Sequence, residues 1–317
     1  MPRILLVKTS SLGDVVHNLP VVTDVASWWP EAEIDWVVEE SFAALPALHP
    51  RVRHAIPVAV RRWRKAAWKS DTRREIGVFV EALRASRYDA VIDTQGLFKS
   101  ALIARAALGP RYGLDFRSSR EPLFPFYDRT FNVPRSLHAV ERNRILAAKA
   151  LGYDAPAQID YGIRANPASN PPLPAADYAV LVHATSAAKK LWPEARWVEL
   201  GRALQEQGLR SVLPWGSDDE RARSERLAAA IPNAVMPPRM PLGDIASVLA
   251  GARCAIGVDT GLTHLAGALG TATVGIYTST GPAATGLHGC ARAANLGAPG
   301  RGPCVEDVLQ ALKSLGA

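Results

Sequence analysis

The chain is 317 residues long, 48% hydrophobic and 21% charged, a composition typical of a globular protein with room for two domains. It has no run of the roughly 18 apolar residues that span a bilayer, no apolar core of a signal peptide, and three cysteines without disulfide or zinc spacing, so we expect a cytoplasmic protein. Its net charge of +7 is concentrated in residues 1–154, with 23 basic against 17 acidic residues. This favours nucleic acid, an anionic membrane surface or an acidic substrate as partner, with a solvated basic surface as the alternative.

Strands and helices are expected to alternate along both halves of the chain. In the first half we predict strands at 3–8, 33–38, 55–57 and 88–94, and helices at 15–29, 41–48, 71–87, 97–108 and 138–151. In the second half we predict strands at 178–183, 210–214, 254–258 and 273–277, and helices at 194–207, 218–230, 242–250, 263–269 and 305–315. Such alternation predicts an α/β fold with two parallel sheets, and ligands at the carboxyl ends of the strands.

A proline-rich run at 166–174 interrupts this alternation and is the best linker candidate. We therefore predict a Rossmann-like domain at 1–160, a linker at 161–176 and a second Rossmann-like domain at 177–302. The final segment, 303–317, is expected to be a helix.

The first loop of the chain, Lys8-Thr-Ser-Ser-Leu-Gly-Asp14, follows a buried strand and leads into a helix. It is neither a P-loop nor a dinucleotide-binding loop, which argues against ATPases and typical NAD enzymes. Asp14 lies at or near the helix N-terminus. Two interpretations stay open for it: a helix cap, or a general base that faces the other domain.

The segment Val258-Asp-Thr-Gly-Leu262 places a strand end directly before a helix made of small residues. Backbone N–H groups at the positive end of a helix dipole suit a diphosphate. His264 lies on the same helix. Of four histidines, none of which has the spacing of metal ligands, it is the best candidate for a functional role. This segment therefore predicts a site for a nucleotide-activated donor.

Two further loops of the second half carry polar side chains at strand ends. Thr185 and Ser186, followed by Lys189 and Lys190, form a plausible phosphate clamp, with a solvated loop as the alternative for the lysines. Glu220 lies in the first turn of an acidic helix. It either stabilises that helix or holds the hydroxyls of a ribose.

A basic segment of the first half, Arg61 to Lys69, contains five cations and two tryptophans within nine residues. It suits phosphates or carboxylates, with the tryptophans in a membrane interface. Taken alone it also fits nucleic acid, or a surface without a ligand. We favour an acidic ligand, because the other motifs indicate an enzyme that acts on small molecules.

These motifs together resemble glycosyltransferase family 9, the heptosyltransferases of lipopolysaccharide, in particular the members that add the first heptose. The resemblance runs from residue 1 to about residue 280. It rests on the segments 8–14, 35–40, 61–65, 93–97, 120–122, 138–142, 183–186, 213–216 and 258–262.

The resemblance implies a GT-B fold, in which two Rossmann-like domains face each other across a central cleft and the C-terminal helix packs back toward the N-terminal domain. It implies an inverting transfer from ADP-L-glycero-β-D-manno-heptose to the 5-hydroxyl of the first Kdo sugar of Kdo2-lipid A. No cofactor or metal and no nucleic acid are expected. The location implied is the cytoplasmic face of the inner membrane, with peripheral attachment.

The resemblance also assigns roles to residues. Asp14 matches the catalytic base, and Lys190 would stabilise the leaving ADP. The donor would be bound by Ser10, Ser11, Gly13, Thr185, Ser186, Lys190, Glu220 at the ribose, Met240 at the adenine, Asp259, Thr260, Gly261 and His264. The acceptor would be held by Arg61, Arg62, Arg64, Lys65, Arg120 and His138. Whether Lys189 shares the role of Lys190 stays open.

Three alternatives remain at this stage. The first is a related enzyme that adds a later heptose. The second is a GT-B-shaped epimerase or hydrolase that processes the nucleotide sugar without an acceptor. The third is a nucleic-acid-binding protein without catalysis, which would bind random duplex DNA more tightly than ADP.

Overall fold

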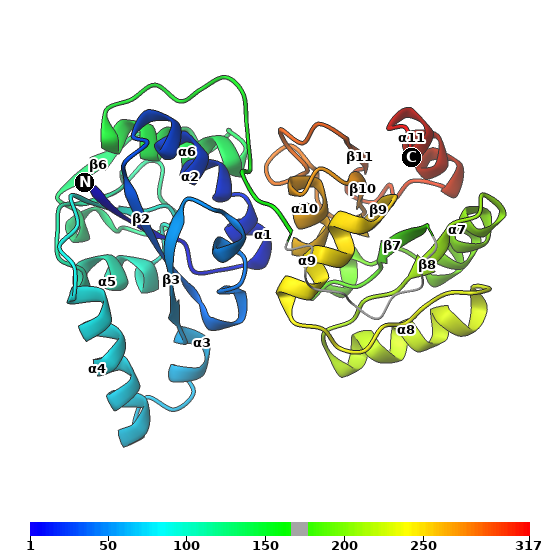
Figure 1. The fold of residues 1–317 in the computed structure, drawn as a ribbon, viewed down its shortest axis with the longest axis horizontal. Coiled ribbons are helices and arrows are strands. Elements are labelled where there is room, and N and C mark those ends of the chain that lie inside the picture. The colour runs from blue at the N-terminus through cyan, green and yellow to red at the C-terminus, as the bar shows by residue number, and fades with distance from the viewer. Residues whose placement is uncertain (166–176) are drawn as a thin grey trace. The chain divides into compact units, whose positions relative to one another are not determined.

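The computed structural model describes residues 1–165 and 177–317, which form two compact units, Met1–Ile163 and Arg164–Ala317 (Figure 1). The boundary between the units falls inside the expected linker, 161–176. Residues 166–176 of that linker, which include its proline-rich run, lie outside the described residues.

The N-terminal unit is built on a parallel sheet of six strands, all within the fully described residues 1–165. Its spatial order is β3-β2-β1-β4-β5-β6, the order of a dinucleotide-binding fold. The strands are β1 (Arg3–Val7), β2 (Glu33–Glu39), β3 (Val52–Val58), β4 (Ala90–Asp93), β5 (Arg111–Leu114) and β6 (Arg129–Phe131). Since β1 lies between β2 and β4, the loops that follow these strands meet at one edge of the sheet.

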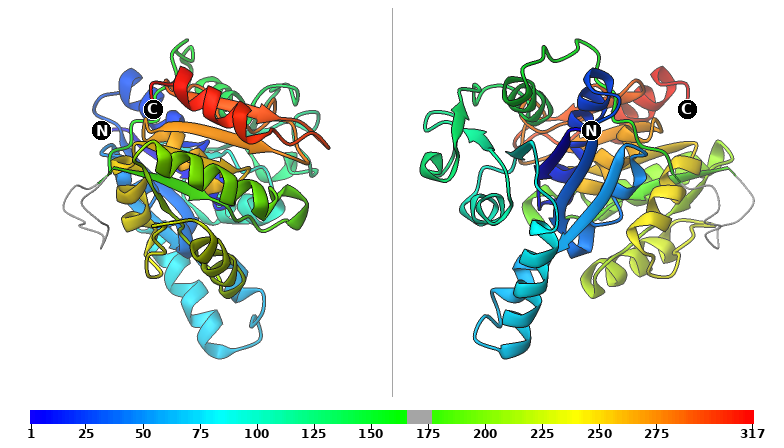
Figure 2. Two further views of the ribbon diagram at one scale, coloured as in Figure 1. Left: turned by 90° about the vertical axis from the view of Figure 1, so that its right-hand side faces the viewer. Right: turned by 60° about the vertical axis from the view of Figure 1, so that its left-hand side comes forward.

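Helices cover both faces of this sheet. The helices are α1 (Leu12–Val16), α2 (Leu19–Trp28), α3 (Val60–Trp63), α4 (Ser70–Arg84), α5 (Phe98–Ala106) and α6 (Ala139–Leu151). Leu5, Val7 and Val91 form a core with Phe79 and Leu83 of α4 and with side chains of α5. The α3–α4 segment extends beyond the end of this sheet in every view (Figures 1 and 2).

The C-terminal unit is built on a second parallel sheet, with five strands among residues 177–317 in the order β11-β10-β9-β7-β8. The strands are β7 (Tyr178–Val182), β8 (Arg210–Val212), β9 (Cys254–Val258), β10 (Ala272–Tyr277) and β11 (Ala293–Gly297). The helices are α7 (Glu194–Glu206), α8 (Asp218–Ala230), α9 (Leu242–Gly251), α10 (Gly261–Ala268) and α11 (Val305–Ser314). No helix of the described residues is long and apolar enough to cross a membrane.

The last helix, α11, belongs to the core of the C-terminal unit. Its apolar side chains Val305, Val308 and Leu312 are almost fully buried and pack with Trp197 of α7 and Ile276 of β10. The apolar face of α11 is thus covered by its own unit, and the expectation that this helix packs back toward the N-terminal domain stays a prediction.

Three local differences separate the predicted elements from the observed ones. The helix expected at 15–29 is divided into α1 and α2, because Pro20 lacks an N–H donor and fits only the first turn of a new helix. The helix expected at 41–48 is replaced by two 3-10 turns, Glu40–Phe42 and Pro46–Leu48. Strands β5, β6 and β11 were not expected, since they are short and are defined by pairing with neighbouring strands.

Candidate active site

Asp14 lies in the first turn of α1, at the carboxyl end of β1. Its Oδ2 accepts hydrogen bonds from the backbone N–H of Ser11 at 2.7 Å and from the Ser11 hydroxyl at 2.9 Å. Asp14 is partly exposed, and no hydrogen bond to its Oδ1 is found among the described residues. The carboxylate therefore caps its own helix through Oδ2, and Oδ1 takes no part in that cap.

Two lysines to which the sequence analysis gave no role belong to the surroundings of Asp14, Lys8 at the start of its loop and Lys99 on α5. Lys8 is buried, and its ammonium donates to the Thr94 carbonyl at 2.9 Å. Burial lowers the pKa of Lys8, although the carboxylates of Asp14 and Asp93 oppose that shift. Lys99, on α5, donates from Nζ to the Ser10 hydroxyl at 2.6 Å. Burial also lowers the pKa of Lys99.

The basic segment that begins at Arg61 is tied to the end of β2 by acidic side chains. The Arg61 backbone N–H donates to Glu39, and the Arg61 guanidinium lies 5.3 Å from the ring centre of Phe42. Arg62 forms ion pairs with Glu40 at 3.1 Å and Glu75 at 2.7 Å. Arg62 thus fastens α3 to α4.

The remaining cations expected to bind the acceptor, Arg64, Lys65 and Arg120, are exposed. Arg120 lies near Lys8 and Arg142, and the pKa of Arg142 is lowered by burial and by the charges of Arg120 and Arg135. These positive charges close to one another favour an anionic ligand.

His138 is buried and caps helix α6. Its Nδ1 accepts from the Val140 backbone N–H at 3.2 Å, and its ring meets the ring of His17 edge-on at 5.4 Å. The role expected for His138, a contact to the acceptor, stays a prediction, and the observed contacts are structural.

Asp259 is the centre of the candidate donor site in the C-terminal unit. It directly follows β9, and Thr260 is the N-cap residue of α10. Asp259 Oδ2 accepts from Lys190 Nζ and from the Thr280 hydroxyl, both at 2.7 Å, and Oδ1 lies 3.5 Å from His264 Nε2. Thr185 donates to the Asp259 carbonyl at 3.4 Å.

These contacts fix the charge of Asp259. Burial alone would raise its pKa, but hydrogen bonds from His264, Lys190 and Thr280 outweigh burial and hold the pKa well below its usual range. Asp259 is therefore a permanent anion that orients a lysine and a histidine beside a helix N-terminus.

Helix α10 lies close to β9 because position 257 is a glycine. A Cβ at Gly257 would lie 2.1 Å from the hydroxyl oxygen of Thr263, which itself donates to the Val258 carbonyl at 2.7 Å. The first backbone N–H groups of α10, beginning at Gly261, are those that a helix leaves without internal partners.

The structure separates the two neighbouring lysines of the expected clamp. Lys190 directs its ammonium to Asp259, whereas Lys189 is exposed and contributes its carbonyl to a bond from the Thr278 hydroxyl. Ser186 is exposed on the same loop.

Glu220 and Met240 lie on two further loops of this unit. Glu220 caps α8, since its Oε2 accepts from the Gly216 backbone N–H at 2.7 Å and from that of Ser217 at 3.3 Å. Met240 is partly exposed in the loop before α9. The structural interpretation of Glu220 is thus observed, and its contact to a ribose stays a prediction.

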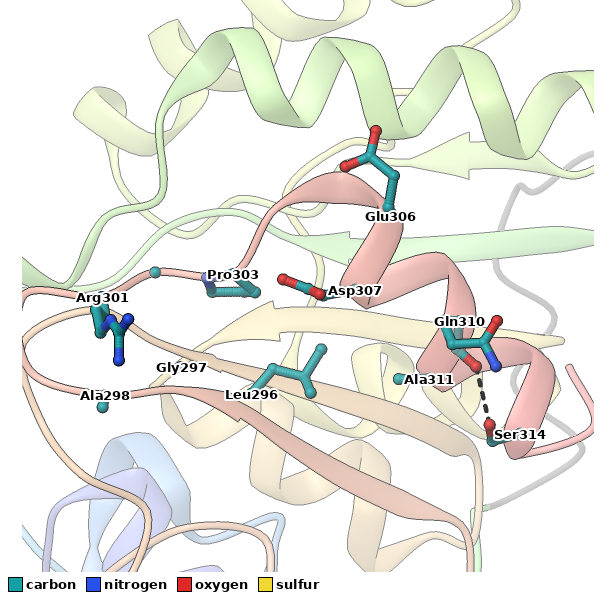
Figure 3. Close-up of a pocket in the computed structure, with 11 residues that line it drawn as sticks. Leu296, Gly297, Ala298, Arg301, Pro303, Glu306, Asp307, Gln310, Ala311 and Ser314 are labelled. Carbon is teal, nitrogen blue, oxygen red and sulfur yellow. Dashed lines mark hydrogen bonds between the residues drawn. The ribbon is translucent and has the colours of Figure 1, made fainter.

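A cavity of about 840 Å³ in the C-terminal unit lies apart from these residues (Figure 3). It runs between β11 and α11 and is lined by Leu296, Arg301, Glu306, Asp307 and Gln310 among others. None of the residues expected to bind the donor lines it.

Comparison with known proteins identifies the family. The family model described as "Glycosyltransferase family 9 (heptosyltransferase)" matches residues 76–313. The chain belongs to this family. It is 47% identical over 290 residues to lipopolysaccharide heptosyltransferase 1 of Escherichia coli K12, covering 90% of this chain and 91% of that protein.

Solved structures agree with this assignment. The structure of E. coli heptosyltransferase WaaC with ADP has a TM-score of 0.92 and 44% identity, and the match covers 99% of each chain. WaaC with ADP-2-deoxy-2-fluoro heptose has a TM-score of 0.88 and 43% identity.

The sequence of lipopolysaccharide heptosyltransferase 2 of E. coli K12 is only 24% identical to this chain, covering 88% of this chain and 84% of that protein.

These findings confirm the expected GT-B fold and the expected enzyme class. The chain is a glycosyltransferase that transfers heptose. The sequence analysis gave no role to Lys8, Gln95 or Lys99. Gln95, two residues after β4, accepts from the backbone N–H groups of Thr9 and Ser10, and Lys99 donates to Ser10 from α5. The signal for Gln95 was the short segment 93–97, where polar side chains directly follow a strand.

Proposed function

We propose that this enzyme transfers L-glycero-D-manno-heptose from ADP-heptose to the 5-hydroxyl of the first Kdo of Kdo2-lipid A, in lipopolysaccharide inner-core synthesis. The observation that carries this proposal is the loop around Asp259, which places a lysine, a threonine and a helix N-terminus at one point of a nucleotide-sugar transferase fold. The higher identity to heptosyltransferase 1 than to heptosyltransferase 2 favours the first heptose over a later one.

The proposed reaction inverts the anomeric carbon in one displacement. Asp14 accepts the proton of the Kdo hydroxyl as its oxygen attacks that carbon from the face opposite the leaving group. The bond to the ADP oxygen breaks through an oxocarbenium-like transition state, as in glycoside hydrolysis. Oδ1 of Asp14 is suited to this role, because Oδ2 is already occupied by Ser11.

Charge on the departing ADP would be stabilised by Lys190 and by the N-terminus of α10. Lys190 already lies in a charge-assisted hydrogen bond, so its ammonium is positioned before the substrate arrives. Because these groups supply positive charge from the protein, we propose that transfer needs no metal. Glu220 would contact the ribose and Met240 the adenine.

The acceptor in this proposal is strongly anionic, and the N-terminal unit offers matching cations. Arg64 and Lys65 are exposed beside α3, and Arg120 lies near Arg142 and Lys8. Kdo carboxylates and lipid A phosphates are suitable ligands for these side chains.

We further propose peripheral attachment to the cytoplasmic face of the inner membrane. The loop between α3 and α4 carries Trp68, whose surface is 71% exposed, between exposed Lys65 and Lys69. An exposed indole flanked by cations suits the interface of an anionic bilayer. Sedimentation with phosphatidylglycerol vesicles should fall in Trp68→Ser, and unchanged sedimentation would contradict this part.

The reaction is tested by measuring ADP release from ADP-heptose in EDTA, with and without Kdo2-lipid A. Release that requires the acceptor supports the metal-free transferase. Release without acceptor would support a hydrolase or epimerase instead. Loss of activity in EDTA that Mg²⁺ restores would contradict the metal-free mechanism, and transfer only to a heptosylated acceptor would assign a later step.

A further inference from the structure

Gln95 holds the loop that carries Asp14. The side-chain oxygen of Gln95 accepts from two consecutive backbone N–H groups, those of Thr9 at 3.0 Å and Ser10 at 3.1 Å. Because both partners are donors, the atom facing them must be the amide oxygen. One side chain from a neighbouring strand end thereby fixes two residues of the loop between β1 and α1.

The position of Gln95 is itself fixed by buried side chains. Asp93, at the end of β4, is fully buried, and its Oδ1 accepts from the backbone N–H groups of Gln95 at 2.9 Å and Gly96 at 3.1 Å. The Tyr127 hydroxyl donates to Asp93 Oδ2 at 2.7 Å. Burial raises the pKa of Asp93, although these bonds oppose the shift.

These contacts connect Tyr127 to Asp14 through hydrogen bonds that alternate with short covalent segments of the chain. Tyr127 and Asp93 fix the turn, Gln95 fixes Thr9 and Ser10, and the adjacent Ser11 binds Asp14 Oδ2 with its N–H and its hydroxyl. Lys99 adds a bond to the Ser10 hydroxyl from the same side.

We infer that Gln95 is a positioning residue for catalysis, which sets where the Asp14 carboxylate lies without contacting the substrates itself. This inference rests on the proposed role of Asp14 as general base. A displacement of about 1 Å in a reacting group can cost on the order of 100-fold in rate. A side chain that fixes the loop should therefore affect the catalytic step more than substrate binding.

The test compares Gln95→Leu with Gln95→Glu. Leucine has a similar size but no acceptor, so kcat should fall about 10- to 100-fold with the KM of both substrates changed less than about threefold. Glutamate keeps an oxygen for the two N–H groups, so kcat at alkaline pH should recover to within about fivefold of the unchanged enzyme. Gln207→Leu, on an exposed residue of the C-terminal unit, serves as control.

The following outcomes distinguish a failure of this inference from a failure of the proposed function. Unchanged kcat in Gln95→Leu would overturn it, and so would a rise in acceptor KM alone, which would make Gln95 a substrate contact. Equal loss in Gln95→Glu and Gln95→Leu would also overturn it. Asp14→Asn is assayed in parallel, because full turnover in that variant would instead remove Asp14 as the base. ADP binding measured by calorimetry should be unchanged in both Gln95 variants, because the proposed ADP site lies in the C-terminal unit, and the urea midpoint of unfolding of each variant reports on folding of the N-terminal unit.

Discussion

Two aspartates follow the ends of parallel strands in the two units, and their surroundings differ. Asp259 is buried and receives hydrogen bonds from Lys190 and Thr280 on the same oxygen, with His264 at the other. Asp14 receives hydrogen bonds from Ser11, three residues before it, and within the described part of the chain Oδ1 accepts none. A carboxylate whose two oxygens both have partners orients the side chains bound to it, whereas a carboxylate oxygen without a hydrogen-bond donor can accept a proton from a substrate. The same strand–loop–helix arrangement thus supports two different tasks.

The sharpest test of this difference is removal of the proton acceptor. Asp14→Asn keeps the size of the side chain, and turnover should fall about 100- to 10,000-fold, the usual contribution of a general base. ADP affinity measured by calorimetry should stay within about twofold. Asp154→Asn, at an exposed residue of the same unit, is the control. Turnover above a tenth of the starting value would show that Asp14 is not the base.

The corresponding change at the other aspartate should have a different kinetic signature. In Asp259→Asn the anion that orients Lys190 and His264 is lost, so donor KM should rise about 10- to 100-fold, with a smaller loss in kcat. Steady-state kinetics with varied ADP-heptose separate the two parameters. A loss confined to kcat would place Asp259 in the chemical step and erase the contrast with Asp14.

A buried histidine of the C-terminal unit, His183, links the stability of that unit to pH. Burial lowers the pKa of His183 to about 4, and its Nε2 lies 2.9 Å from the Ser224 hydroxyl. In the unfolded chain a histidine titrates near 6.5, so below that pH the unfolded state binds a proton that the folded state does not. Stability from His183 is present above pH 6.5 and is lost as pH falls toward 4.

Because of His183, the free energy of unfolding should fall by about 2 kcal/mol between pH 7 and pH 5. Urea unfolding followed by tryptophan fluorescence, to which the buried Trp192 and Trp197 contribute, measures it, and the difference between the unchanged protein and a His183 variant isolates the histidine. His183→Asn should reduce the pH dependence by about that amount. A variant with the same pH dependence as the unchanged protein would contradict the assignment.

The smallest expected effect separates the two lysines. Lys190→Ala should weaken ADP-heptose binding about tenfold, through loss of one charge-assisted contact to phosphate. Lys189→Ala should stay within about twofold, because its side chain is exposed and only its carbonyl is used. Calorimetric titration of both variants with ADP-heptose measures the two affinities. A weaker complex in Lys189→Ala than in Lys190→Ala would assign the phosphate contact to Lys189.

Local sequence patterns determined most of the elements and the place of the donor loop. Short apolar runs bounded by turn residues, such as 254–258, are typical of buried strands, and Asp-Thr-Gly before small residues starts a helix beside its strand. The order of several family motifs determined the family as well. Each of these signals lies within about ten residues, so it can be read without knowing the fold.

Tertiary structure alone decided which side chains meet. Gln95 reaches Thr9 across 86 residues and Lys190 reaches Asp259 across 69, because strand order places β1 beside β4 and β7 beside β9. The same holds for α11, whose amphipathic pattern predicted a helix but not the sheet that it covers. Periodicity specifies which face of an element is apolar, whereas the partner of that face depends on the path of the whole chain.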